Sequence, residues 1–181
     1  PLWLYIICIV GNMLRQNPEL LTTLNKGISF TEMRPAQILS SLQKKISSDF
    51  PPLENVSFEL KTVHDSMKDY LSPAFYLTPP IDTGTPNVIY INPAANYQGL
   101  ELFTTLAHEG FPGHLYQTVS FERQNPSGIR NLLDTSGFAE GWATYVEPFA
   151  YEYAADYILD SSASDLARLA WLNRSINLCM Y

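Results

Sequence analysis

Two of the three histidines in this 181-residue sequence lie in one short segment, residues 106–114, and a glutamate directly follows the first of them. Histidine is a common ligand of zinc, and a carboxylate beside a bound metal can take a proton from water that the metal activates. A His-Glu pair followed on a helix by another histidine is typical of zinc hydrolases. The segment therefore predicts zinc ligands at His108 and His114 and a general base at Glu109.

The spacing of the two histidines departs from the regular pattern. Four residues on a helix correspond to a rotation of roughly 40°, which turns both rings to one side, whereas six residues correspond to roughly 240°. Pro112 has no N–H to donate to the carbonyl of His108, and Gly113 reaches backbone angles closed to other residues. We expect a bulge or kink here to bring His114 back toward the metal. The alternative is a helix that stops at Phe111, with His114 on the surface of the next turn.

A zinc site closed by the protein needs a third ligand. His64 precedes the motif by a long stretch broken by prolines and is interpreted as a capping or surface residue. Glu140 is the better candidate, because the small and aromatic residues around it suggest burial, and a buried carboxylate without a partner is strongly unfavourable. A cation at the motif would satisfy it. The alternative is an ion pair with Arg123 or Arg130.

Hydrophobic periodicity and turn signals predict the elements that must position these residues. Residues 57–63 and 87–91 are expected to be strands, and the edge of the second should lie near the site, where an extended substrate could pair with it. The motif helix is expected from residue 96 or 99 to about 123, and a further helix over 138–159 with a kink at Pro148. Other helices are expected over 18–24, from 31 to 46 and from 162 or 164 onward, and the Pro-rich segment 72–86 is expected to be a loop.

The helix expected over 138–159 has two distinct faces. Four aromatic residues recur at helical spacing and are expected in the core: Phe138, Trp142, Tyr145 and Phe149. Glu140 and Glu147 are nearly two turns apart and share the other face, so Glu147 is expected to orient a metal ligand through a hydrogen bond. Tyr145 or Tyr151 could donate a hydrogen bond to the developing oxyanion. Asn92, which ends the second strand, is a further candidate for contact with a ligand or the substrate.

Length and composition restrict the class of protein. The chain begins at Pro1 and stops in a helical pattern, so we expect a piece of a longer protein. Charged residues make up 16%, which is below average usage and suits a well-buried interior, and the net charge of −7 argues against a nucleic-acid partner. The apolar run 2–10 is too short for a membrane span. Cys8 and Cys179 are expected to be buried free thiols.

Two segments, residues 106–117 and 139–147, together resemble the bacterial family catalogued as domain of unknown function 885. The family pattern is His-Glu-x-x-Pro-Gly-His (the HExxPGH motif), followed one helix later by Glu-Gly-Trp-Ala-x-Tyr-x-Glu. Residues 88–92 and the loop 76–80 also resemble the family's approach to the motif. The resemblance extends from about Val56 to the C-terminus and is weaker upstream.

The resemblance implies a likeness in plan to thermolysin-like zinc metallopeptidases with His-His-Glu ligands. His108, His114 and Glu140 would be the ligands and Glu109 the general base. Many members carry a second histidine where this chain has Leu115, so that neighbour is no alternative ligand here. The family also continues past this C-terminus into a helix with a further Asp and His near the site.

These observations predict a mostly helical fold with a small β-sheet, forming a zincin-like metallopeptidase core. We expect a single partial domain over 1–181, with a helical scaffold over 1–55 and the core with the metal-site helices over 56–181. The expected function is Zn²⁺-dependent hydrolysis of a peptide substrate by metal-activated water, with Glu109 as general base. The alternatives are a metal-free module that binds extended peptides and an inactive structural fragment whose His-Glu-His group only stabilises a helix crossing.

Overall fold

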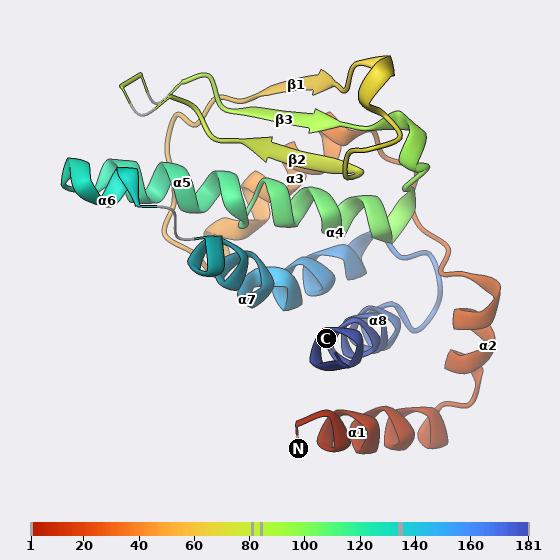
Figure 1. Ribbon diagram of the computed structural model, residues 1–181. Coiled ribbons are helices and arrows are strands. Elements are labelled where there is room, and N and C mark those ends of the chain that lie inside the picture. The colour runs from red at the N-terminus through yellow and green to blue at the C-terminus, as the bar shows by residue number, and fades with distance from the viewer. Residues whose placement is uncertain (1, 81, 84, 134–135, 181) are drawn as a thin grey trace. The chain divides into compact units, whose positions relative to one another are not determined.

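The computed structural model describes residues 2–80, 82–83, 85–133 and 136–180, which form mostly helices with one small sheet (Figure 1). The coarse fold class predicted from the sequence is therefore confirmed. The elements, in chain order, are α1 (Leu2–Gln16), α2 (Glu19–Lys26), α3 (Pro35–Lys45), η1 (Ile46–Ser48), β1 (Glu59–Thr62), η2 (Asp65–Met67), β2 (Ala74–Leu77), β3 (Val88–Ile91), η3 (Pro93–Ala95), α4 (Gly99–Glu109), α5 (His114–Arg123), α6 (Gly128–Leu132), α7 (Ser136–Ala154), η4 (Ala155–Tyr157) and α8 (Ala163–Met180).

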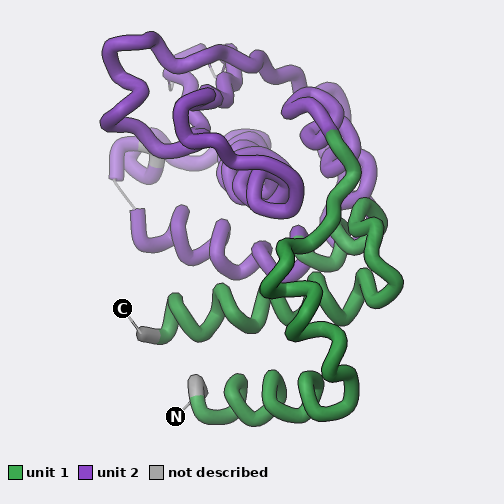
Figure 2. Tube along the Cα trace, turned by 90° about the vertical axis from the view of Figure 1, so that its right-hand side faces the viewer, with its two compact units in different colours: residues 1–32, 151–181 green, residues 33–150 purple. Residues whose placement is uncertain are grey.

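The chain forms two compact units, residues 1–32 with 151–181 and residues 33–150 (Figure 2). The expectation of a single partial domain over 1–181, divided near residue 55, stays a prediction, because a division by contacts does not determine which parts fold together. His108, His114 and Glu140 all belong to the second unit.

In the first unit α1 packs against α8, and α2 contacts both helices. Their shared apolar core is built around Leu20, Leu166 and Leu169. Cys8 and Cys179 are free, as predicted, but both are exposed, so the expectation of burial was wrong. The reason for Cys8 is that α1 carries more apolar residues than the face packed on α8 can bury. None of the helices in the described part of the chain combines the length and the apolar character of a membrane span.

The second unit contains a sheet in which β3 lies between β1 and β2 (Figure 1). β1 is parallel to β3, and β2 is antiparallel to it. β1 and β3 lie within the segments predicted as strands, but β2 lies within 72–86, which was wrongly expected to be a loop; residues 81 and 84 of that segment are outside the described residues. Pro73 made this segment look like a loop, because proline has no N–H to donate to a sheet. Here only the carbonyl of Pro73 is used, and it accepts from the N–H of Asn92 at 2.8 Å. The available edge near α4 therefore belongs to β2, which contacts α4, and not to β3.

Helix α3 packs against α4 in the same unit. Pro35 lies in the first turn, as predicted, but the helix begins at Pro35 and not at residue 31. The predicted apolar positions Leu39, Leu42 and Ile46 are buried. The central strand contributes Ile89, which is fully buried. The elements around the motif therefore have a continuous apolar core that fixes α4.

Helix α7 buries a different face from the one predicted. Phe138 and Tyr145 are 66% and 61% exposed, so their assignment to the core was wrong. The buried positions of α7 carry mainly small side chains, together with one carboxylate and one aromatic ring: Ala143, Val146, Glu147, Ala150, Tyr153 and Ala154. Small residues allow the backbone of α7 to lie close to its neighbours, and the bulky aromatic rings then fall at the margins of the contact.

Candidate metal centre

The motif occupies the end of α4, the start of α5 and the four residues between them. One kinked helix was expected, but α4 ends at Glu109 and α5 begins at His114. The N–H of Gly113 donates to the carbonyl of Ala107 at 3.0 Å, and the N–H of Tyr116 donates to the carbonyl of Gly110 at 3.1 Å. Both hydrogen bonds span six residues instead of the four of an α-helix, so the break takes up two extra residues, as expected of a bulge, and α5 continues in the direction of α4 (Figure 1).

Gly113 lies against the backbone of α4 so closely that no other residue fits. A Cβ atom at this position would be 1.7 Å from the carbonyl oxygen of His108 and 2.6 Å from that of Ala107. The contact places His114 beside His108 instead of on the surface of a following turn. The two imidazole rings are 4.8 Å apart between centroids, with their planes at 88°.

The two imidazoles and the carboxylate of Glu140 converge. Nε2 of His108 is 3.6 Å from Oε2 of Glu140, and Nε2 of His114 is 3.5 Å from Oε1. One ligand atom from each residue can be chosen so that all three lie within 4.8 Å of one another. The Glu140 side chain is 65% exposed, so its predicted burial was wrong: it lies near the start of α7, on a side that remains open to solvent.

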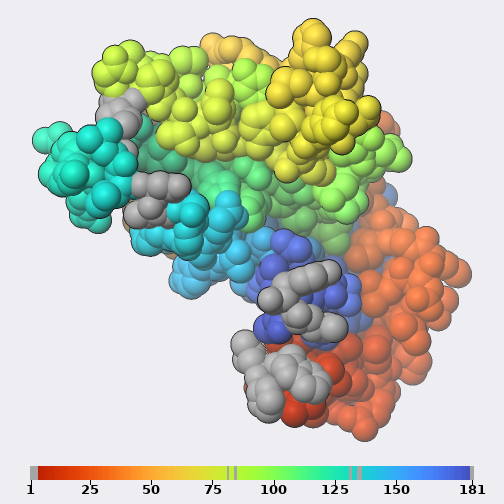
Figure 3. All heavy atoms as spheres, in the orientation of Figure 1, coloured from red at the N-terminus to blue at the C-terminus, as the bar shows by residue number. Residues whose placement is uncertain are grey.

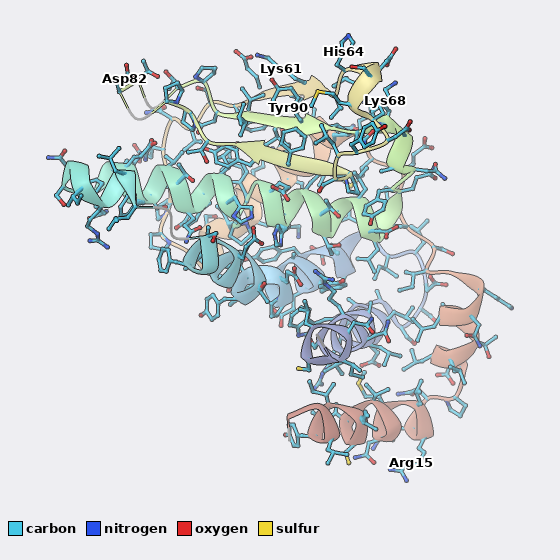
Figure 4. All side chains as sticks on the ribbon, viewed as in Figure 1. Arg15, Lys61, His64, Lys68, Asp82 and Tyr90 are labelled. Carbon is cyan, nitrogen blue, oxygen red and sulfur yellow. The ribbon has the colours of Figure 1, made fainter. Side chains whose placement is uncertain are left out.

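The alternative partners considered for Glu140 have other contacts. Arg123 donates to the backbone carbonyl of Glu54, and the guanidinium of Arg130 lies over the ring of Phe121, 5.4 Å from its centroid. His64 caps η2, as expected for a capping residue, because its ring accepts from the N–H of Ser66. In Figure 4 His64 points outward at one end of the sheet, on the side away from α4.

Glu147 contacts His108 through Nδ1, the ring nitrogen that does not face Glu140. Its Oε1 is 3.1 Å from Nδ1 of His108, and the Glu147 side chain is almost completely buried. A carboxylate can only accept, so Nδ1 carries the hydrogen, and in the neutral form of the imidazole Nε2 faces the cluster with its lone pair. The contact expected for Glu147 from the sequence is therefore present in the structure.

Burial and neighbouring charges shift the pKa values of the two imidazoles in opposite directions. Burial disfavours the imidazolium of His108, but the hydrogen bond to Glu147 and the charges of Glu109, Glu147 and Glu140 outweigh it and raise the pKa. Burial, followed by the nearby charge of His108, lowers the pKa of His114 although Glu140 opposes this. Hence His114 favours the neutral form that a metal requires.

Replacing Glu147 with glutamine is expected to weaken zinc binding about 10- to 100-fold. The amide oxygen can still accept from Nδ1 of His108, but it lacks the negative charge that makes the imidazole a stronger ligand. Competition with a chromophoric chelator measures the affinity. Glu152→Gln, on an exposed position of the same helix, is the matched control and should bind zinc as the wild type does. Equal affinities in the two variants would exclude this role for Glu147.

Glu109 is held by a backbone group from the sheet. Its Oε2 accepts from the N–H of Tyr76 at 2.8 Å. Burial raises the pKa of Glu109, while the Tyr76 hydrogen bond and the charge of His108 oppose the rise. Sequence reasoning missed Tyr76, and the signal that could have found it is the short apolar run 74–77 between prolines.

Three other sequence candidates have structural contacts. The amide of Asn92 donates to the carbonyls of Lys68 and Leu71, and its oxygen caps η3. The ring of Tyr145 packs against Trp142, and that of Tyr151, in the first unit, against Trp171. Their contacts with a ligand or substrate stay predictions.

Helices α4 and α5 are visible between the sheet and α7 on one face of the molecule. Figure 3 shows their green atoms between the yellow-green atoms of the strands and the blue atoms of α7. Because the Glu140 side chain is 65% exposed, the candidate cluster can be approached from solvent.

The fold and the site define a mostly helical protein with a small mixed sheet and a His-His-Glu cluster suited to a metal ion. Residues 31–178 match the family described as "Bacterial protein of unknown function (DUF885)", and the chain belongs to this family. The family expected from the sequence is thus confirmed, over a longer stretch than residues 56 onward.

Other comparisons add the fold of one solved structure. The sequence matches none of the curated proteins with which it was compared. A crystal structure described as "the putative lipoprotein from Colwellia psychrerythraea" is similar, with a TM-score of 0.68 and 20% identity. The match covers 96% of this chain and 32% of that one, so this chain spans about a third of that protein's length. At this identity the likeness shows the fold alone.

Proposed function

We propose that this chain carries the zinc site of a zincin-like metallopeptidase. The observation that carries the proposal is the convergence of His108, His114 and Glu140, with Glu109 beside the cluster. Two imidazole nitrogens and one carboxylate are a donor set that zinc uses in hydrolytic enzymes, where a fourth position stays open.

The donor atoms are somewhat farther apart than those around such an ion. Ligand atoms around a four-coordinate zinc lie roughly 3.3 Å from one another when each is roughly 2.0–2.1 Å from the metal. Nε2 of His108 and Nε2 of His114 are 3.6 and 3.5 Å from different oxygens of Glu140, and a set with one ligand atom from each residue spans up to 4.8 Å, so the side chains would have to move closer together to close the site. A bound zinc would lower the pKa of a water molecule and polarise the carbonyl of a substrate.

The remaining chemistry belongs to the chain's own residues. Glu109 takes a proton from water as the peptide carbonyl is attacked and passes it to the leaving amine. The N–H of Tyr76 holds Oε2 of Glu109, which leaves Oε1 for the proton. Glu147 keeps the imidazole of His108 oriented through Nδ1.

The edge of β2 supports a peptide as the substrate. Strand alternation directs the N–H of Tyr76 away from β3, and the carbonyls of Ala74 and Tyr76 point the same way. An extended peptide can pair with such an edge through its main chain. The N–H of Tyr76 already donates to Glu109, so a peptide on this edge would pair with the carbonyls of Ala74 and Tyr76 and would lie beside the general base.

Zinc content tests the proposal. The purified chain should hold close to one zinc ion, and His114→Ala should remove it, because two ligands seldom hold zinc against a chelator. His64→Ala is the matched control, since this ring caps η2, and it should leave the metal content unchanged. Atomic emission spectroscopy measures both. Zinc retained in full by His114→Ala would overturn the proposal, and peptide binding that is indifferent to chelator and without hydrolysis would favour the metal-free alternative.

A further inference from the structure

The indole of Trp142 joins the two segments that carry His114 and Glu140. Trp142 lies in α7 two residues after Glu140, and its Nε1–H donates to the carbonyl of Pro112 at 2.9 Å. Pro112 is in the break before α5, two residues before His114. A single hydrogen bond therefore connects the neighbourhoods of two proposed ligands.

Both partners of this hydrogen bond are held firmly. Pro112 is completely buried, and Gly113 after it lies against the carbonyl of His108. The indole is stacked on Tyr116 at 6.3 Å between centroids, with an interplanar angle of 7°, and meets the edge of Phe50 at 6.1 Å. A buried carbonyl needs a donor, so removing the indole N–H would leave the Pro112 oxygen without this partner.

The start of α7 has a second contact with α5. The amide of Gln117 lies 3.5 Å from the backbone carbonyl of Phe138, a long hydrogen bond. Glu140 lies in sequence between this contact and Trp142. The stronger of the two bonds around Glu140 is thus the one made by the indole.

We propose that Trp142 is a positioning residue that sets the separation between Glu140 and His114. The inference rests on the proposed function, because the separation matters only if the two side chains share a metal. Without the indole N–H, the first turns of α7 can shift relative to Pro112, while the contact between Glu147 and His108 persists. The carboxylate of Glu140 would then be displaced from its position beside the metal, while the imidazoles of His108 and His114 would stay in place.

The sharpest test removes only the N–H. Trp142 is replaced by 3-benzothienylalanine, which keeps the bicyclic ring and has sulfur in place of N–H, and also by phenylalanine. Cobalt(II) is the probe, because its visible absorption reports the geometry of its ligands. We expect Co²⁺ affinity to fall about 3- to 10-fold and the absorption bands to change, as the loss of one hydrogen bond implies. Trp171→Phe, in the first unit, is the control and should change neither.

A second measurement works without metal. The chain has three histidines, so ¹³C-labelled histidine introduces three labelled imidazoles, and we expect the isostere to move the signal of His114 and to leave that of His64 unchanged. If the wild type binds no metal, the proposed function fails, and the His114 signal still tests whether Trp142 sets the separation between Glu140 and His114. If the wild type binds Co²⁺ and the isostere shows the same affinity, absorption bands and His114 signal, the role of Trp142 is overturned. The isostere decides the outcome if the phenylalanine variant does not fold.

Discussion

Replacing Glu109 with glutamine is expected to lower peptide hydrolysis by about 10²- to 10⁴-fold while the zinc content stays the same. Glutamine keeps the size of the side chain and can still accept the N–H of Tyr76, but it cannot take a proton from water. The proposed metal ligands His108, His114 and Glu140 are untouched. Turnover of a fluorogenic peptide library, with zinc measured on the same samples, separates the two effects.

The matched control is Glu101→Gln, at an exposed position of the same helix α4, which should keep wild-type turnover. The fold itself should tolerate Glu109→Gln. Burial raises the folded-state pKa of Glu109 above its ordinary value of 4.5, so the folded state holds the proton more tightly than the unfolded state. Ionisation therefore lowers stability as pH rises above that ordinary value, and glutamine removes this contribution. Wild-type turnover by Glu109→Gln would exclude the residue as the general base.

Replacing Gly113 with alanine is expected to remove zinc binding and to lower the free energy of unfolding by about 1–3 kcal/mol or more. The new Cβ would meet the carbonyl oxygen of His108 at 1.7 Å, and that atom belongs to the backbone of α4, so no side-chain rotation relieves the clash. The break must move outward, which carries His114 away from His108. Urea unfolding gives the stability, and titration of the metal-free protein gives the zinc affinity.

Gly141→Ala provides the opposite expectation at a nearby glycine. Gly141 lies within α7, and a Cβ there would have nothing within 4 Å. Alanine restricts the unfolded chain and favours the helix, so stability should rise by about 0.5–1 kcal/mol with zinc binding unchanged. If Gly113→Ala behaved like Gly141→Ala, the close approach of Gly113 to α4 would not be what places His114.

The bulge at the motif could be predicted, but the extent of the break could not. Pro112 and Gly113 are residues that end or deform a helix, and the six-residue spacing required a local distortion for His114 to return. Local chemistry does not determine whether a helix kinks or breaks, because the two differ in the packing available to the inserted residues. Here Gly110 and Gly113 fit against α4, and the break extends to four residues.

Burial was predicted less well than the grouping of His108, His114 and Glu140. The composition around Glu140 suggested a buried carboxylate, and the spacing of Phe138 and Tyr145 suggested core positions, yet all three are exposed. Periodicity identifies which residues share a face, but the width and position of the contact depend on the neighbouring elements. The buried face of α7 is centred on Ala143, where a small side chain permits close packing.

The amino-acid sequence by itself determined the residues of the candidate site and the family. The His-Glu pair, the Pro-Gly break and two glutamates seven residues apart are local patterns, and their chemistry does not depend on the rest of the chain. It also determined β1 and β3, whose alternation and β-branched residues favour strands wherever they are placed.

Only the tertiary structure decided which strand lies at the edge and what holds the residues of the candidate site. β2 is short and bounded by prolines, so its pairing with β3 is a non-local event that periodicity does not reveal. The N–H of Tyr76 on Glu109 and the indole of Trp142 on Pro112 join residues 33 and 30 positions apart. Such contacts arise from the packing of whole elements, because only folding brings donors and acceptors so distant in the chain within reach of each other.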